Sequence, residues 1–173
     1  MRTTLRTEAL SHCFEPIADR NAKILILGSM PGRESLEARQ YYANRRNAFW
    51  NIMAELLGFD PASSYEARVH ALRSARIALW DVLQTCKRVG SLDAMIEADT
   101  ITANDFRSFF RNHERIRAVF FNGTKAESSY RQYVLPTVDT ACVSYLRLPS
   151  TSPTHASLPF DKKLEAWRIA LRP

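Results

Sequence analysis

The chain has 173 residues, 46% of them hydrophobic, and its formal net charge of +6 gives a pI near 9.5. This length fits one domain with a buried core, and the positive charge favours an anionic partner. Three widely separated cysteines argue against a disulfide framework or a Cys-x-x-Cys metal site. Since no apolar run approaches the roughly 20 residues of a membrane span, and the N-terminus lacks a signal-peptide pattern, we expect a cytoplasmic protein.

The apolar positions follow two different periods along the chain. Continuous apolar runs predict four short strands, over residues 23–28, 76–82, 116–121 and 141–148. Helical spacing predicts helices over residues 34–39, 49–57, 65–72, 106–110, 124–133 and 161–171. We expect residues 14–17 to lie across the sheet, residues 85–96 to form mainly a loop, and Thr124 to cap the helix that follows it. With right-handed crossovers, this order predicts an α/β fold: a three-layer α/β/α sandwich with a four-stranded parallel sheet.

Chemically useful side chains follow several of the predicted strands. The run Gly28-Ser29-Met30-Pro31-Gly32 comes after the first strand, and residues 41–50 add aromatic, amide and arginine side chains. Asn122 ends the third strand, and a hydroxyl-rich loop over residues 150–155 follows the fourth; Trp80-Asp81 ends the second strand at the same edge. Because the carboxyl ends of parallel strands share one edge of the sheet, these groups should be neighbours. They can stack on a flat ring, hydrogen-bond its edge and neutralise phosphate, so we expect a bound nucleobase there.

Several common nucleotide and hydrolase motifs are absent. The sequence contains neither Gly-x-x-x-x-Gly-Lys-[Ser/Thr] nor Gly-x-Gly-x-x-Gly, which argues against a P-loop or a dinucleotide site. It also lacks Gly-x-Ser-x-Gly. His155 lies near Ser150 and Ser152 in a polar loop, and that proximity alone does not indicate an activated serine.

Three motifs together resemble the uracil-DNA glycosylase superfamily: Gly28-Ser29-Met30-Pro31-Gly32, Tyr42-Ala43-Asn44-Arg45-Arg46-Asn47-Ala48-Phe49-Trp50 and Leu148-Pro149-Ser150-Thr151-Ser152-Pro153. The similarity is greatest to the hypoxanthine-DNA glycosylase branch, and next to the mismatch-specific uracil/thymine glycosylases. It implies one glycosylase-like domain over residues 1–173 and a monofunctional DNA N-glycosylase of base-excision repair. Such an enzyme flips a deaminated base, here expected to be hypoxanthine, out of double-stranded DNA and leaves an abasic site. We expect a monomer without cofactor, metal or membrane contact.

One departure from the mismatch-type motif concerns the catalytic water. Met30 stands where those relatives carry an asparagine that positions it, so we expect Asn47 to position the water and Ser29 to stabilise the leaving base. Two alternatives remain open: a uracil or mismatched-thymine glycosylase on the same scaffold, and a catalytically silent protein that binds damaged DNA.

The remaining site residues are predicted for binding. Tyr42 is expected to stack on the base, beside Phe49, and Met30 to form an apolar wall. Asn122 presents a donor and an acceptor that match the O6 and N1–H edge of hypoxanthine, although uracil offers the same order. For the DNA backbone we expect contacts from Gly32, Arg46, Lys125, Ser150, Thr151, Ser152 and His155, with Thr154, His155 or Ala156 near the gap that the flipped base leaves.

Overall fold

The computed structural model describes residues 10–172, and its centre is a parallel sheet of four strands in the order β3-β2-β6-β7. The strands are β2 (Ile24–Gly28), β3 (Ile77–Asp81), β6 (Ala118–Asn122) and β7 (Ser144–Leu148). All three pairings are parallel, so every strand ends at the same edge. The predicted fold class is confirmed, and each strand end lies within three residues of its expected position.

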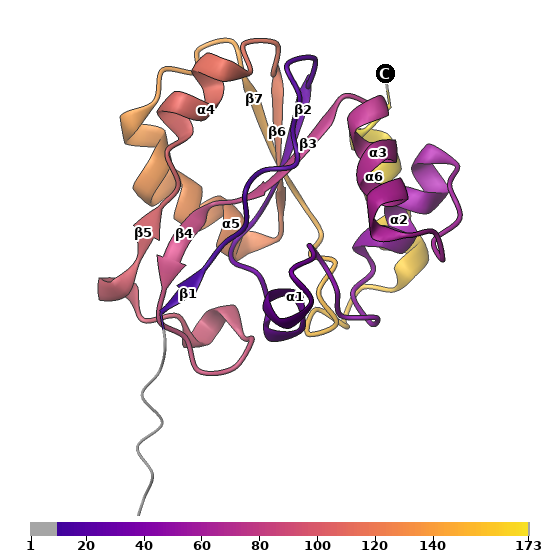
Figure 1. Cartoon of the computed structure of the whole chain (residues 1–173), viewed down its shortest axis with the longest axis horizontal. Helices are drawn as coiled ribbons and strands as arrows, with labels where there is room; N and C mark the ends of the chain where they lie inside the picture. The colour runs from indigo at the N-terminus through magenta and orange to yellow at the C-terminus, as the bar shows by residue number, and fades with distance from the viewer. Residues whose placement is uncertain (1–9, 173) are drawn as a thin grey trace, which may run out of the picture.

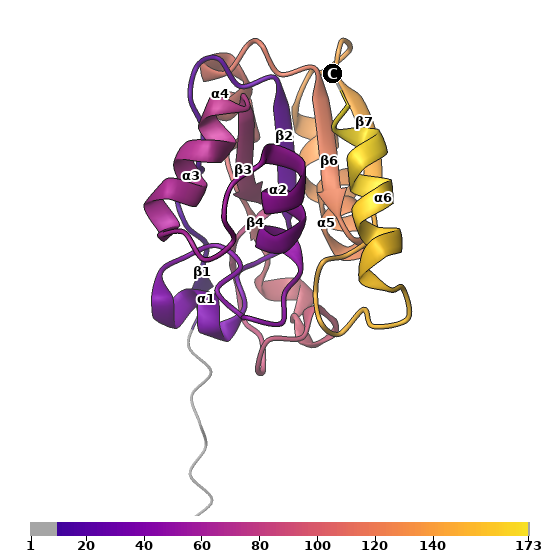
Figure 2. The same cartoon turned by 90° about the vertical axis from the view of Figure 1, so that its right-hand side faces the viewer.

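Helices cover both faces of this sheet (Figure 1). On one face lie α2 (Phe49–Leu57), α3 (Tyr65–Ser74) and α6 (Phe160–Ala170); on the other lie α4 (Phe106–Asn112) and α5 (Thr124–Ser129). The short helix α1 (Arg33–Ala38) sits beyond the strand ends. Figure 2 shows α2 and α6 packed in front of β2 and β6. No helix of residues 10–172 has the length and apolarity needed to cross a membrane.

The core forms around β2, an inner strand of the parallel sheet. Leu25, Ile26 and Leu27 are fully buried because β2 lies between two strands and between two helical layers. Outside β3, Ile17 exchanges two backbone hydrogen bonds with Leu79, of 2.9 and 2.8 Å. The segment expected to lie across the sheet therefore runs along its β3 edge and covers part of it.

A second, smaller sheet was not expected. It joins β1 (Ser11–His12), β4 (Leu83–Cys86) and β5 (Thr102–Ala103) in antiparallel pairs, in the order β1-β4-β5. The prediction of a loop over residues 85–96 was therefore wrong at its start, where Thr85 and Cys86 belong to β4. A short 3₁₀ turn, η1 (Asp93–Met95), lies within the rest. β4 follows directly after β3, so the small sheet continues beyond the parallel sheet. It places residues 87–97 near the ends of the parallel strands.

Two predicted helix details also differ from the structure. The cap of α5 is Gly123 rather than Thr124, since Gly123 has a φ of 93°, where glycine meets no steric penalty. The helix expected over residues 124–133 is α to Ser129 and continues as a π turn, η3 (Tyr130–Val134). Close packing explains the glycine too, because a Cβ at position 123 would lie 2.9 Å from the Cβ of Ser150.

Candidate active site

A cavity of about 360 Å³ lies where the parallel strands end, the lower edge of the sheet in Figure 1. Its walls come from the loop after β2, the end of β3, the segment around η1, the end of β6 and the loop after β7. Most of the predicted site residues line it: Ser29, Met30, Gly32, Tyr42, Arg46, Asn47, Asn122, Ser150, Thr151 and Ser152. Three predicted residues do not: Phe49, Lys125 and His155.

The Tyr42 ring is held in the cavity wall by its neighbours. Its backbone φ is 54°, in the left-handed region that residues other than glycine seldom adopt. The ring stacks on Phe49, with centroids 4.2 Å apart and planes tilted by 24°. Trp50 fixes the preceding peptide group, because its indole N–H donates to the Tyr41 carbonyl over 2.8 Å. Since Phe49 is fully buried behind Tyr42, any contribution it makes to base binding acts through that ring.

The side-chain amide of Asn122 joins three loops. Its Nδ2 donates to the Tyr42 hydroxyl over 3.0 Å and to Oγ1 of Thr151 over 2.8 Å. Its Oδ1 accepts the Thr151 backbone N–H over 2.9 Å, which fixes the orientation of the amide. Both amide hydrogens are thereby engaged within the protein. Asn122 lies at the cavity, as expected, but it holds Tyr42 and Thr151 rather than presenting a free donor.

Asp81 is a buried carboxyl group that the binding predictions left out. It ends β3 directly beside Gly28 of β2, and the residue is only 4% exposed. A Cβ on Gly28 would overlap Oδ1 of Asp81 and come within 3.0 Å of the Tyr42 hydroxyl, so glycine makes room for both groups. Among residues 10–172, Oδ2 of Asp81 has no hydrogen-bond partner. The cavity therefore contains a carboxyl group with unused hydrogen-bonding capacity.

Burial controls the protonation of Asp81. Its pKa is raised from 3.8 to about 8, mainly by loss of solvation and also by the nearby Asp93 carboxylate, while the Arg88 guanidinium opposes this rise. Burial also raises the pKa of the Tyr42 phenol, with Asp81 adding to the effect. At neutral pH both groups are predominantly neutral, so the cavity offers an un-ionised carboxyl that can both donate and accept a hydrogen bond.

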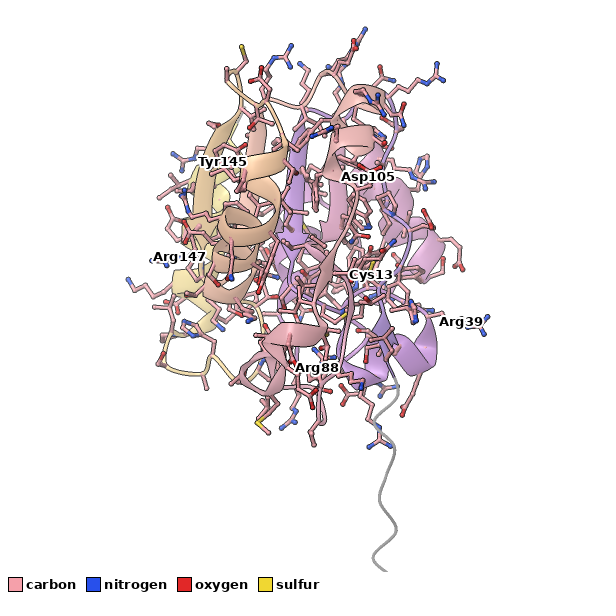
Figure 3. The ribbon with its side chains drawn as sticks, turned by 90° about the vertical axis from the view of Figure 1, so that its left-hand side faces the viewer. Cys13, Arg39, Arg88, Asp105, Tyr145 and Arg147 are labelled. Atoms are coloured by element: carbon pink, nitrogen blue, oxygen red, sulfur yellow. The ribbon has the colours of Figure 1, made fainter. Side chains whose placement is uncertain are left out.

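A cluster of three polar side chains, Ser29, Asp93 and Arg88, closes the cavity on the side of η1. The Ser29 hydroxyl donates to Asp93 over 2.7 Å, and Arg88 lies 3.6 Å from the same carboxylate. The Arg88 side chain is almost fully buried, and its guanidinium also donates to the carbonyls of Pro31 and Gly90, over 2.5 and 3.1 Å. Figure 3 labels Arg88 at the lower end of the molecule. The hydroxyl hydrogen of Ser29 is thus committed to Asp93 and is not free for a leaving base.

Asn47 lies where the first loop enters α2. Its Oδ1 accepts the backbone N–H of Phe49 over 3.0 Å, which stabilises the start of the helix next to its cap residue, Ala48. The same side chain lines the cavity, and an amide oxygen has a second lone pair. The next residue, Ala48, donates its N–H to the Thr151 carbonyl over 2.9 Å. Asn47 is therefore held between a helix start and the loop after β7, with acceptor capacity left over.

The residues predicted to contact DNA divide into two groups. Arg46 is exposed at the cavity, where Ser150 and Ser152 also lie. His155 belongs to a neighbouring cavity, which it shares with Gly123, Arg147 and Ser157, while Lys125 lies on α5 outside both. Within residues 10–172, no group of three or more His, Cys, Asp or Glu side chains is placed to hold a metal ion.

The sequence places the end of β3 at the edge of the expected site, but it predicted no role for Asp81. The available signal was Asp81 itself, a carboxylate that ends an otherwise apolar strand at the edge of the expected site. Arg88 and Asp93 gave no comparable signal, because charged residues in an expected loop are usually solvated. Their pairing depends on how residues 87–97 fold back on the loop after β2.

Comparison with known proteins agrees with this geometry. The model of the uracil DNA glycosylase superfamily matches residues 15–171. Hypoxanthine DNA glycosylases of Methanosarcina barkeri and Methanosarcina acetivorans are each 39% identical to this chain over 114 residues, which is 65% of this chain and 71% of each relative. A solution NMR structure from M. acetivorans, provisionally described as a uracil DNA glycosylase, is 32% identical, with a TM-score of 0.79 over 95% of this chain and 98% of that one.

The resemblance carried by the three motifs is thus confirmed over nearly the whole length of the chain. The strand ends, the cavity that they surround and the match of the family model lead to one conclusion: this chain belongs to the uracil DNA glycosylase superfamily, a family of DNA glycosylases.

Proposed function

We propose that the protein removes hypoxanthine from double-stranded DNA by hydrolysing the N-glycosidic bond of a flipped deoxyinosine, leaving an abasic site. The observation that carries this proposal is the buried Asp81 carboxyl, which shares the cavity with the Tyr42 ring and has an oxygen without a partner among the described residues. The two curated relatives named as hypoxanthine DNA glycosylases support the same base. We expect a cytoplasmic enzyme that acts as a monomer.

Base recognition in this proposal combines stacking with one edge contact. The Tyr42 ring, backed by Phe49, provides the stacking surface, and Met30 provides an apolar wall. Hypoxanthine presents the N1–H donor next to the O6 acceptor. A neutral carboxyl complements both, because its carbonyl oxygen accepts N1–H while its O–H donates to O6. Asp81 takes this role from Asn122, whose amide hydrogens hold Tyr42 and Thr151.

Hydrolysis then requires a placed water and a stabilised leaving group. Oδ1 of Asn47 accepts a hydrogen bond from the water, whose oxygen attacks C1′ of the sugar. The C1′–N9 bond breaks, and its electron pair goes to the purine, where negative charge develops partly on O6. The O–H of Asp81 stabilises that charge, and the proton that the attacking water loses on becoming the C1′ hydroxyl is taken up by the released base. Ser29 contributes by holding Asp93, to which it donates over 2.7 Å.

Backbone binding is assigned to the polar rim of the cavity. The hydroxyls of Ser150 and Ser152, the Gly32 peptide and the exposed Arg46 line the same opening. These groups are suited to the phosphates that flank a flipped nucleotide. Lys125 and His155 do not line this cavity and are proposed to contact phosphates beyond this position.

Excision of uracil is the second candidate function. Uracil presents an N–H donor between carbonyl acceptors, so the neutral Asp81 carboxyl fits its edge as well. The M. acetivorans NMR structure, at 32% identity, is the specific observation that favours it.

A single-turnover cleavage panel tests these proposals. Duplexes containing one deoxyinosine, deoxyuridine or deoxyxanthosine are incubated with excess protein, and abasic sites are revealed by alkali. We expect release of hypoxanthine, and a loss of roughly a hundredfold in rate for Asn47→Ala. The matched control, Asn51→Ala, changes an exposed asparagine of α2 outside the cavity and should keep the wild-type rate. Release of uracil alone would favour the second candidate, and binding without any release would refute both.

A further inference from the structure

The helix α6 holds the loop after β7 at two points. At the start of the loop, Trp167 donates its indole N–H to the Pro149 carbonyl over 3.1 Å. One helical turn earlier in α6, and on the same face of the helix, the Lys163 ammonium donates to the His155 carbonyl over 2.8 Å. Figure 2 shows this loop at the lower end of α6. The two contacts therefore fix the loop against α6 at its beginning and again at His155.

The far part of the loop, residues 152–155, is held to α6 by Lys163. We call these residues the outer turn. Its other hydrogen bonds stay within the loop: the His155 N–H donates to the Ser152 carbonyl over 3.0 Å, and the hydroxyls of Ser152 and Thr154 lie 2.8 Å apart. Within residues 10–172, the Lys163 contact is the hydrogen bond that joins the outer turn to another element. The shape of the turn is thus set locally, while its position against α6 depends on Lys163.

Lys163 is a buried charged residue in an otherwise polar part of the surface. It is only 5% exposed, and this burial lowers the pKa of its ammonium. All the ion pairs found among residues 10–172 use arginine side chains, so no described carboxylate is paired with this ammonium. An ammonium also has three N–H donors, and the His155 carbonyl takes one of them. Because a buried charge is most stable when it is paired, Lys163 favours an anion at the outer turn.

The outer turn lies at the opening through which DNA would reach the cavity. Ser152 and Thr154 line that cavity, and Thr154 and His155 are exposed. Hydroxyl and backbone N–H groups of this kind are suited to a phosphate. We propose that Lys163 is a positioning residue for DNA binding: it holds the outer turn in the place where the turn receives a phosphate of the duplex, and it supplies positive charge beneath that phosphate. Because its ammonium is buried, Lys163 acts through the turn and touches neither the base nor the sugar.

This inference rests on the proposed DNA glycosylase function, and a binding experiment tests it without requiring catalysis. Fluorescence anisotropy gives the Kd for a labelled duplex that contains a tetrahydrofuran abasic analogue, which has no base to release. Lys163→Met keeps a side chain of similar length without charge or donor, and we expect it to weaken binding about tenfold. The matched control, Lys162→Met, removes the same charge from the neighbouring, exposed position of α6 and should bind within about threefold of the wild type.

A second variant guards against a loss of folding. Far-UV circular dichroism establishes whether each variant is folded. Lys163→Gln keeps an N–H donor but has no charge, and it should weaken binding at least about fivefold. Wild-type affinity in folded Lys163→Met or Lys163→Gln, or an equal loss in Lys162→Met, would overturn the assignment.

Single-turnover cleavage of deoxyinosine DNA distinguishes a positioning role from general damage to the site. The rate is measured against protein concentration. Lys163→Met should raise the half-saturating concentration about tenfold and change the saturated rate by less than about threefold, because Asn47 and Asp81 are untouched. A loss confined to the saturated rate would contradict the proposal. If the wild type binds the duplex but releases no hypoxanthine, the proposed function fails, while the comparison of Kd values still decides the role of Lys163.

Discussion

Replacing Asp81 with asparagine should remove a large part of the pH dependence of stability. The folded Asp81 has a pKa of about 8, against 3.8 for an ordinary aspartate. Between these values the folded state keeps a proton that the unfolded state has lost, so the free energy of unfolding falls as the pH rises. The slope from this one group is about 1.4 kcal/mol per pH unit, which amounts to ~3 kcal/mol between about pH 5 and about pH 7. That is a substantial fraction of the roughly 5–15 kcal/mol that stabilises a typical domain.

Urea unfolding, followed by the fluorescence of the buried tryptophans Trp50, Trp80 and Trp167, measures this effect across the same pH range. The difference in unfolding free energy between Asp81→Asn and the wild type should grow with pH in favour of the variant. Asp105→Asn is the matched control, because Asp105 caps α4 at the surface and its backbone contact to Ser108 lowers its pKa. The stability that Asp105 contributes is lost only as the pH falls below the ordinary aspartate value, so its difference from the wild type should stay constant here. A difference for Asp81→Asn that varies by less than about 0.5 kcal/mol over this range would refute the assignment of a buried, neutral carboxyl.

Further predictions concern the groups around Asp81. Gly28→Ala should cost about 1–3 kcal/mol of stability, measured by thermal unfolding, because its Cβ overlaps Oδ1 of Asp81. Asn122→Ala should cost about 1–3 kcal/mol by urea unfolding, since it removes the links to Tyr42 and Thr151, and it should increase amide exchange in residues 149–155. Tyr42→Phe keeps the ring and should retain cleavage within about tenfold, whereas Tyr42→Ala should lose more. The single-turnover rate on deoxyinosine DNA should fall above about pH 8, as Asp81 loses its proton, and this fall should be absent in Asp81→Asn.

The four-stranded sheet could be predicted because its strands carry a local signal. Leu25, Ile26 and Leu27 form a continuous apolar run, as expected of a strand that is covered on both faces. The small antiparallel sheet lacked such a signal. β1 and β5 are two residues long, and their pairing with β4 depends on contacts between segments far apart in the chain. Two-residue strands have no periodicity to detect, so this sheet emerges only from the tertiary structure.

The candidate site shows the same division between local and long-range information. Tyr42, Asn47 and Asn122 were found from their motifs and from the rule that parallel strands end at one edge, and the structure places all three at the cavity. Their partners could not be found in this way. Asn122 donates its amide hydrogens to Tyr42 and Thr151, and Oδ2 of Asp81 has no partner among the described residues. Both arrangements depend on side-chain geometry across three loops.

The position of α6 determines when, during synthesis, the cavity can first exist. Trp167 of α6 is fully buried, its indole N–H donates to the Pro149 carbonyl over 3.1 Å, and its ring packs edge-on against Phe49. The loop after β7 in turn accepts the Ala48 N–H through Thr151. A chain emerging from the ribosome can pair β2 with β3 and β6 before α6 appears, but the loop after β7 then lacks its contact with Trp167. The complete cavity should therefore form only once α6 has left the exit tunnel and docked.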